Sequence, residues 1–294
     1  MSGRTRSFFA AIVSSAAIVL VASTAQPAPA EGGRRVSRVP SKDGTPIAVE
    51  CAGTGPTLLM VHGGIGDRTR WTPMFPLLES RFTACAMDRR GHGESGDAPD
   101  YDLRKEAEDI AAVVDSQPGP VFLLGHSYGG VAALEAAFLN PKVVRLVLYE
   151  PPVTEPSDPA MIEKIERLIA SGKREEAALT FWREVVKYSE AELVAMQARP
   201  SWPGLVADFD SHPRQMRALA AYRFDEERMR SLATPALLLL GGETRSPALK
   251  RAIESLDASL PHSTVVVLEG QEHNAMDRDR EQLARVLTTH LLAQ

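Results

Sequence analysis

The chain has 294 residues, of which 44% are hydrophobic and 24% are charged. This is the composition of a globular protein, and it excludes a disordered, collagen-like or coiled-coil chain. The net charge of −5 argues against a nucleic-acid partner, which selects basic surfaces, and against attraction to anionic lipid. Two cysteines are too few for a disulfide scaffold or a cysteine-ligated zinc site.

The first thirty residues have the features of a secretory signal peptide. Arg4 and Arg6 precede the apolar run 8–21, which is shorter than the about 20 residues that a membrane-spanning helix needs. Small residues follow, and alanines at positions 28 and 30 suit cleavage after Ala30. The alternatives are an uncleaved anchor or a buried first helix. We expect a secreted or periplasmic protein with no stable membrane span after cleavage.

Short apolar runs alternate with helical patterns along the rest of the chain. Runs such as 58–61 and 237–240 have no polar alternation, which is typical of strands buried on both faces of a parallel sheet. Such alternation of strands and helices predicts βαβ units in a three-layer α/β domain. The predicted strands are 47–51, 57–62, 82–87, 121–125, 144–149, 236–240 and 264–268, with a weaker one at 35–39; the predicted helices are 103–114, 131–139, 247–260 and 280–292.

The stretch 153–232 interrupts this alternation. It contains no strand-like run, and its apolar residues recur at helical spacing, as at Ile162 and Ile165. Ser189 followed by Glu192 predicts a capping box at the start of one helix. The predicted parts are therefore a signal peptide (1–30), an α/β core (31–152 and 233–294) and a helical insertion (153–232).

Gly125-His-Ser-Tyr-Gly129 directly follows the predicted strand 121–125 and precedes a helix. It fits the pattern G-x-S-x-G, in which a serine lies on a sharp strand-to-helix turn that glycine makes possible. Ser127 is therefore the candidate nucleophile. The alternative interpretation is a glycine-rich turn with a serine of no function.

Two further strand ends supply candidate site residues, since sites in open α/β sheets form beyond the carboxyl ends of the strands. His62-Gly63-Gly64 ends one strand, and the backbone N–H groups of Gly64 and Tyr128 are the candidate oxyanion hole. His273 follows the last predicted strand, and the order of serine before histidine makes it the candidate base. The alternative for His273 is an exposed loop histidine.

The chain resembles the α/β-hydrolase superfamily over about residues 35–294. The resemblance is carried by His62-Gly-Gly64, Asp88-Arg-Arg-Gly-His-Gly-Glu-Ser95, Gly125-His-Ser-Tyr-Gly129 and His273. It implies the α/β-hydrolase fold, a mostly parallel central sheet with helices on both faces and a helical cap at 153–232. It gives the segment 88–95 a structural role only. In this fold the strands of Cys51 and Cys85 are neighbours, which leaves either a disulfide or two buried free thiols.

Two glutamates compete for the role of the acid that fixes the tautomer of His273 and stabilises its imidazolium form. Many members of the superfamily carry an aspartate after the seventh strand, but in Gly241-Gly-Glu-Thr-Arg245 an arginine occupies that position. Other members place the acid after the sixth strand, where this chain has Glu150. We therefore predict Glu150, with Glu243 as the alternative acid.

A serine nucleophile with a histidine base favours acyl transfer to water, whereas epoxide hydrolases and haloalkane dehalogenases of this superfamily use an aspartate nucleophile. We predict an esterase that acts on a small-molecule acyl substrate without a metal or other cofactor. The alternatives are a lactonase, perhydrolase, amidase or carbon–carbon bond hydrolase with the same triad. A binding protein that keeps the fold but has no catalytic activity is the alternative from another class.

Overall fold

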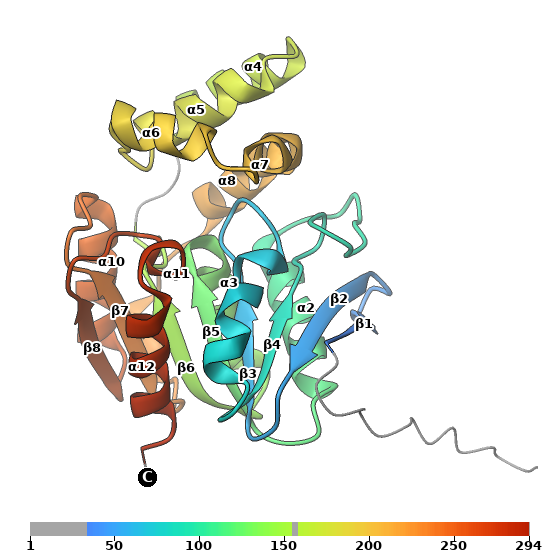
Figure 1. The fold of residues 1–294 in the computed structure, drawn as a ribbon, viewed down its shortest axis with the longest axis vertical. Helices are drawn as coiled ribbons and strands as arrows, with labels where there is room; N and C mark the ends of the chain where they lie inside the picture. Colours follow the sequence, from blue (N-terminus) through green and yellow to red (C-terminus); the bar gives the residue numbers. More distant parts are fainter. Residues whose placement is uncertain (1–33, 155–157, 294) are drawn as a thin grey trace, which may run out of the picture. The chain divides into compact units, whose positions relative to one another are not determined.

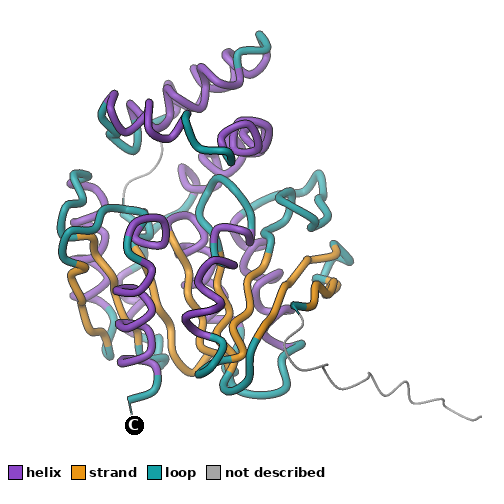
Figure 2. Tube along the Cα trace, in the orientation of Figure 1, coloured by secondary structure: helices purple, strands orange, loops and turns teal. Residues whose placement is uncertain are grey.

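The computed structural model describes residues 34–154 and 158–293, so the predicted signal peptide lies outside the described residues. In the described part, eight strands form one sheet in the order β1-β2-β4-β3-β5-β6-β7-β8 (Figures 1 and 2). The strands are β1 (Arg35–Pro40), β2 (Pro46–Ala52), β3 (Thr57–Val61), β4 (Thr83–Met87), β5 (Val121–His126), β6 (Val143–Tyr149), β7 (Ala236–Gly241) and β8 (Ser263–Leu268). Strand β2 pairs antiparallel with β1 and β4, and the other neighbours are parallel. The predicted mostly parallel sheet is confirmed.

Helices cover both faces of the sheet, which explains the absence of polar alternation in its central strands. All five residues of β3 are buried. Leu59 and Val61 pack into an apolar cluster with α2 (Leu103–Asp115), α3 (Ser127–Leu139) and α10 (Pro247–Ser259). Leu58 and Met60 pack on the opposite face with α1 (Phe75–Leu78) and α12 (Arg280–Leu291). Successive side chains of a strand point to opposite faces, so each strand contributes to two cores.

The described part of the segment between β6 and β7 consists of helices joined by loops and contains no strand. Its helices lie over the carboxyl ends of the parallel strands and form the cap (Figure 1). They bury an apolar cluster of their own that includes Ile162, Ile165 and Trp182. The predicted capping box is present, because Ser189 and Glu192 exchange both hydrogen bonds at the start of α6. The cap comprises α4 (Pro159–Ala170), α5 (Arg174–Glu184), α6 (Glu190–Gln197), α7 (Trp202–Ala207), η3 (Asp208–Ser211), α8 (His212–Ala221) and α9 (Glu226–Arg230).

Cys51 and Cys85 face each other across the antiparallel pair β2 and β4 and are joined by a disulfide. Of the two alternatives that the sequence left open, the bridge is the one present in the structure. None of the described helices has the length and apolar character needed to cross a bilayer.

Candidate active site

Ser127 lies at the turn from β5 into α3, where its φ of +52° falls in the left-handed region. Residues other than glycine rarely adopt this conformation, and its cost is on the order of 1–3 kcal/mol. Glycines on either side allow the tight turn. A Cβ on Gly125 would lie 2.6 Å from the Gly129 carbonyl oxygen, and a Cβ on Gly129 would lie 2.1 Å from the His62 carbonyl oxygen. Close packing of α3 against the ends of β3 and β5 therefore requires both glycines of the G-x-S-x-G pattern.

The early start of α3 differs from the sequence-based expectation. The pattern predicted a helix from residue 131, whereas α3 begins at Ser127. Gly129 and Gly130 have low helix propensity, so periodicity alone places the start after them. In the folded chain these glycines belong to the first turn of α3, where a Cβ on Gly129 would meet the His62 carbonyl after β3 and a Cβ on Gly130 would meet Pro151 after β6.

His273 and Glu150 are brought together by the ends of β8 and β6. The Nδ1 atom of His273 is 2.6 Å from Oε2 of Glu150. Glu150 is fully buried, and its Oε1 accepts hydrogen bonds from the Gly241 N–H at 2.7 Å and from the Thr244 hydroxyl. Because Glu150 accepts at Nδ1, that nitrogen carries the proton and Nε2 is left as the basic atom of the ring.

Glu150 shares the left-handed backbone of Ser127, with φ of +46°. Its own N–H donates to the Leu239 carbonyl on β7, which continues the pairing of β6 and β7. Such conformations persist only where the surrounding structure imposes them, and they cluster at functional sites. The strained backbone thus marks the same two strand ends that carry the candidate nucleophile and acid.

The alternative acid, Glu243, lies in a different environment. Its side chain is exposed, and its carboxylate faces Arg278 at 3.7 Å. Arg245, which the sequence resemblance places at the family's aspartate position, pairs with Glu192 and Glu272. Neither side chain is a partner of His273, whereas Thr244 between them binds Glu150.

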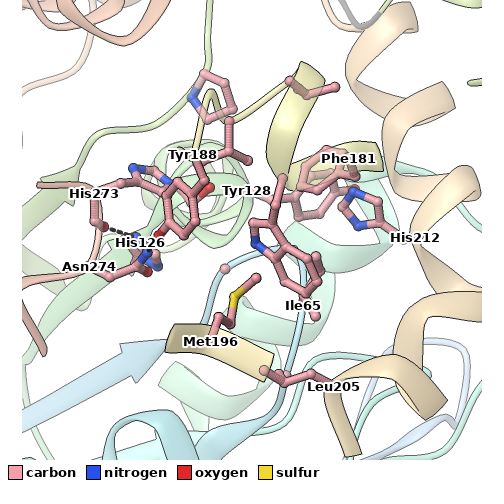
Figure 3. A pocket seen from close by; sticks show the side chains of 18 of the residues that line it. Ile65, His126, Tyr128, Phe181, Tyr188, Met196, Leu205, His212, His273 and Asn274 are labelled. Atoms are coloured by element: carbon pink, nitrogen blue, oxygen red, sulfur yellow. Dashed lines mark hydrogen bonds between the residues drawn. The ribbon is translucent and has the colours of Figure 1, made fainter. Parts of the chain in front are cut away.

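Two residues absent from the predicted site hold the His273 loop. His126 Nε2 is 2.7 Å from the His273 carbonyl oxygen (Figure 3). The Tyr149 hydroxyl donates to the Glu272 carbonyl and accepts from the Ala275 N–H. Burial lowers the pKa of His126 well below its ordinary value, with a further contribution from neighbouring His273, so the ring is neutral at pH 7 and Nε2 is the donor. The only sequence signal for this pair was their position directly before Ser127 and Glu150.

A cavity of about 910 Å³ lies between the strand ends and the cap. Gly63, Gly64, Ser127, Tyr128 and His273 all line it, and a Cβ on Gly63 would lie 3.3 Å from the Ser127 Cβ. The candidate oxyanion loop is therefore next to the candidate nucleophile. The cap contributes mostly apolar side chains to the cavity wall (Figure 3). They include Met161, Phe181, Trp182, Met196, Leu205, Met216 and Leu219.

Residues 58–286 match the model of the Alpha/beta hydrolase family. The chain therefore belongs to the α/β-hydrolase family and is a hydrolase by class. Over 264 residues it is 27% identical to 2-(acetamidomethylene)succinate hydrolase of Mesorhizobium japonicum, covering 81% of this chain and 89% of that protein.

Solved structures give the same picture of the fold. An alpha/beta hydrolase from Sphaerobacter thermophilus superposes with a TM-score of 0.77 at 34% identity, covering 87% of this chain and all of that one. A thermophilic esterase from Thermogutta terrifontis superposes with a TM-score of 0.71 at 22% identity, covering 87% of this chain and 98% of the other. The second likeness concerns the fold alone.

Proposed function

We propose that the protein hydrolyses a carboxylic ester or a similar acyl bond of a small molecule through Ser127, His273 and Glu150. The observation that carries this proposal is the 2.6 Å contact between His273 Nδ1 and buried Glu150, at a cavity that Ser127 also lines. An imidazole oriented in this way by a carboxylate has the geometry of a general base for a serine nucleophile. Membership of a hydrolase family supports it further.

The reaction then has two steps, acylation of Ser127 and hydrolysis of the acyl-enzyme, which use the same proton transfers. The Ser127 Oγ attacks the acyl carbon while its proton passes to Nε2 of His273, and Glu150 stabilises the imidazolium that forms. The N–H groups of Gly64 and Tyr128 bind the oxyanion of the tetrahedral intermediate. Its collapse releases the alcohol, which takes the proton from His273 and leaves an acyl-enzyme. Water attacks the acyl-enzyme with the same proton transfers and releases the acid.

The cavity suits acyl groups of small or medium size, since its volume of about 910 Å³ falls in the range of small-molecule sites and more than half of the cap residues that line it are apolar. Amide hydrolysis is the second candidate. The relative from Mesorhizobium japonicum supports it, because its name records a substrate with an acetamido group.

We also propose that the protein is exported, with the signal peptide removed after Ala30. The charged start, short apolar run and small-residue exit of the sequence support export. The Cys51–Cys85 disulfide supports it independently, because such bonds persist in oxidising compartments. The intact mass of the protein recovered from periplasm or medium tests the proposal, and a mass that retains residues 1–30 contradicts it.

Active-site labelling tests the catalytic proposal directly. The wild-type protein is expected to react with a fluorophosphonate probe and to hydrolyse p-nitrophenyl esters, and Ser127→Ala abolishes both. Ser201, another serine that lines the cavity, provides the matched control, and Ser201→Ala keeps both activities. Esters of increasing acyl length, compared with the corresponding amides, then define the substrate. A folded wild-type protein that neither labels nor turns over any of them is the non-catalytic binding protein instead.

A further inference from the structure

Arg89, in the loop after β4, is a fully buried cation that contacts both residues of the proposed oxyanion hole. Its Nη2 donates to the Gly64 carbonyl at 3.4 Å. Its guanidinium carbon lies 4.6 Å from the centroid of the Tyr128 ring, a cation–π contact. Its Nη1 donates to Glu106 at 3.0 Å, so its charge is balanced inside the protein.

Tyr128 is tied to the same group by a second route. The Tyr128 hydroxyl is 2.9 Å from the Tyr101 hydroxyl, which donates to Glu106 at 2.6 Å. Glu106 thus joins Arg89 and Tyr101, and the four side chains close a ring. This ring holds the side chain of the residue that directly follows Ser127.

The backbone of Arg89 orients the loop that carries Gly64. Its N–H donates to Nε2 of His62 at 3.1 Å, which leaves the His62 proton on Nδ1. That Nδ1–H donates in turn to the Gly63 carbonyl at 2.9 Å. The carbonyl and N–H of one trans peptide point in opposite directions, so a Gly63 carbonyl that faces His62 directs the Gly64 N–H to the other side.

The cap joins this network through Gln215 of α8. Its Oε1 accepts from Arg89 Nη2 at 2.8 Å, and its Nε2 is 2.9 Å from Nε2 of His92. Gln215 is buried, and a Cβ on Gly64 would lie 3.4 Å from its Oε1. The same Nη2 of Arg89 therefore contacts the cap and the Gly64 carbonyl.

We propose that Arg89 is a positioning residue for the hydrolysis, and that Gln215 couples the seating of the cap on the core to the geometry of the oxyanion hole. The inference rests on the proposed function. With α8 seated, Arg89 is held between Glu106, the Gly64 carbonyl and Gln215, and the hole is ordered before substrate binds. Such preorganisation stabilises the transition state and leaves ground-state binding nearly unchanged.

Arg90 provides a matched control. It is as buried as Arg89, but it binds Asp109 at 2.6 Å through both Nε and Nη2 and Asp43 at 3.0 Å. Within the described residues it has no hydrogen bond to Gly64, Tyr128 or the cap. Loss of either arginine removes a buried ion pair, but only Arg89 reaches the proposed hole.

The experiment compares Arg89→Met, Arg90→Met and Gln215→Leu by kcat, KM and Ki, at a temperature well below the Tm of each. The Ki is that of a trifluoromethyl ketone, to which Ser127 adds while its proton passes to His273 and the ketone oxygen becomes an oxyanion. Arg89→Met is expected to lower kcat about 10²-fold and to raise Ki by a similar factor, with KM changed less than about twofold. Gln215→Leu lowers kcat about tenfold, since the Gly64 contact of Arg89 remains. Arg90→Met lowers the Tm but keeps kcat and Ki.

Equal kcat values for Arg89→Met and Arg90→Met, per active site titrated with fluorophosphonate, overturn the proposal. Where Arg89→Met does not fold, Gln215→Leu and Arg89→Lys decide. Lysine keeps the charge but has one nitrogen in place of the two, Nη1 and Nη2, that share these contacts, so it is expected to restore only part of kcat. Wild-type kcat and Ki in both variants overturn the proposal. A wild-type protein without Ser127-dependent labelling rejects the proposed function itself. Normal labelling together with unchanged kcat and Ki in the Arg89 variants rejects the further inference alone.

Discussion

Replacing Glu150 by glutamine, which has the same shape but no charge, would reverse the direction of its hydrogen bond with His273 Nδ1. Its Oε1 is committed to the Gly241 N–H and the Thr244 hydroxyl, both donors. In Glu150→Gln the amide oxygen takes that position, and the amide NH₂ faces Nδ1 of His273. The ring must then accept at Nδ1 and carry its proton on Nε2, where it can no longer take a proton from Ser127.

We therefore expect Glu150→Gln to lower kcat by about 10⁴ while the protein stays folded, as for loss of the acid in other serine triads. Steady-state kinetics with a p-nitrophenyl ester measure this loss. Glu243→Gln is the control and keeps near wild-type kcat, because Glu243 is exposed beside Arg278. An inactive Glu243→Gln with an active Glu150→Gln would assign the acid to Glu243.

At the scale of elements, the disulfide joins β2 and β4, and the parallel strands β3, β5, β6 and β8 carry the loops with Gly64, Ser127, Glu150 and His273. The bond closes a loop with a sequence separation of 34 residues. A loop of that length implies a stabilisation of about 3–4 kcal/mol through the unfolded chain. The hydrogen bonds that hold Gly63, Gly64, Glu150 and His273 involve neither cysteine.

We expect the double substitution of Cys51 and Cys85 by serine to lower the free energy of unfolding by about 3–4 kcal/mol and to leave kcat within about twofold. Urea unfolding measured with and without a thiol reductant checks this. The reductant should destabilise the wild type and have no effect on the double variant. A wild type whose unfolding is insensitive to the reductant, once the bond is shown to be reduced, contradicts the expectation.

The strands were predictable because each depends on local pattern. Every predicted strand is present, with ends that differ by no more than one residue, since apolar runs between turn residues define them. Ser127 was predictable for the same reason, as its motif is a strand, a glycine turn and a helix in sequence. The position of Glu150 at the end of β6 also followed from local pattern.

The contacts that join distant segments were not predictable. Arg89 and Gln215 are 126 positions apart, and His126 and the His273 carbonyl are 147 apart. Neither pair has a local motif, because both depend on how the cap and the last loop pack on the core. The segment 88–95 was assigned a structural role only, since its contacts with Gly64 and the cap arise only in the folded chain.

At the scale of the whole molecule, burial makes stability sensitive to acid. It lowers the pKa of His62, His92 and His126 well below the ordinary value, and that of His212 to about 3. The unfolded chain protonates these rings near pH 6.5, whereas the folded chain does not. The unfolded state therefore binds more protons below that pH, and stability falls as the pH falls from about 7 towards 3.

We expect each of these histidines to lower the free energy of unfolding by about 2 kcal/mol when the pH falls from 7.5 to 5. Urea unfolding curves recorded at both pH values measure the total loss. Burial raises the pKa of Asp88, Glu106 and Asp109, which opposes this trend only near their own titration range. His212→Gln should reduce the pH dependence, because it removes one of these buried rings. Equal pH dependence in wild type and His212→Gln would contradict the argument.

Helices α4 to α7 of the cap bury an apolar cluster of their own, whereas Met229 of α9 belongs to a core cluster of the sheet. The packing of these cap helices is therefore largely independent of the packing of the sheet. Cavity-facing positions such as Met161 and Met196 can be varied without disturbing the strands beneath the reacting groups. A combinatorial library confined to such positions, with Gln215 of α8 kept, would therefore sample new selectivities on an unchanged catalytic scaffold.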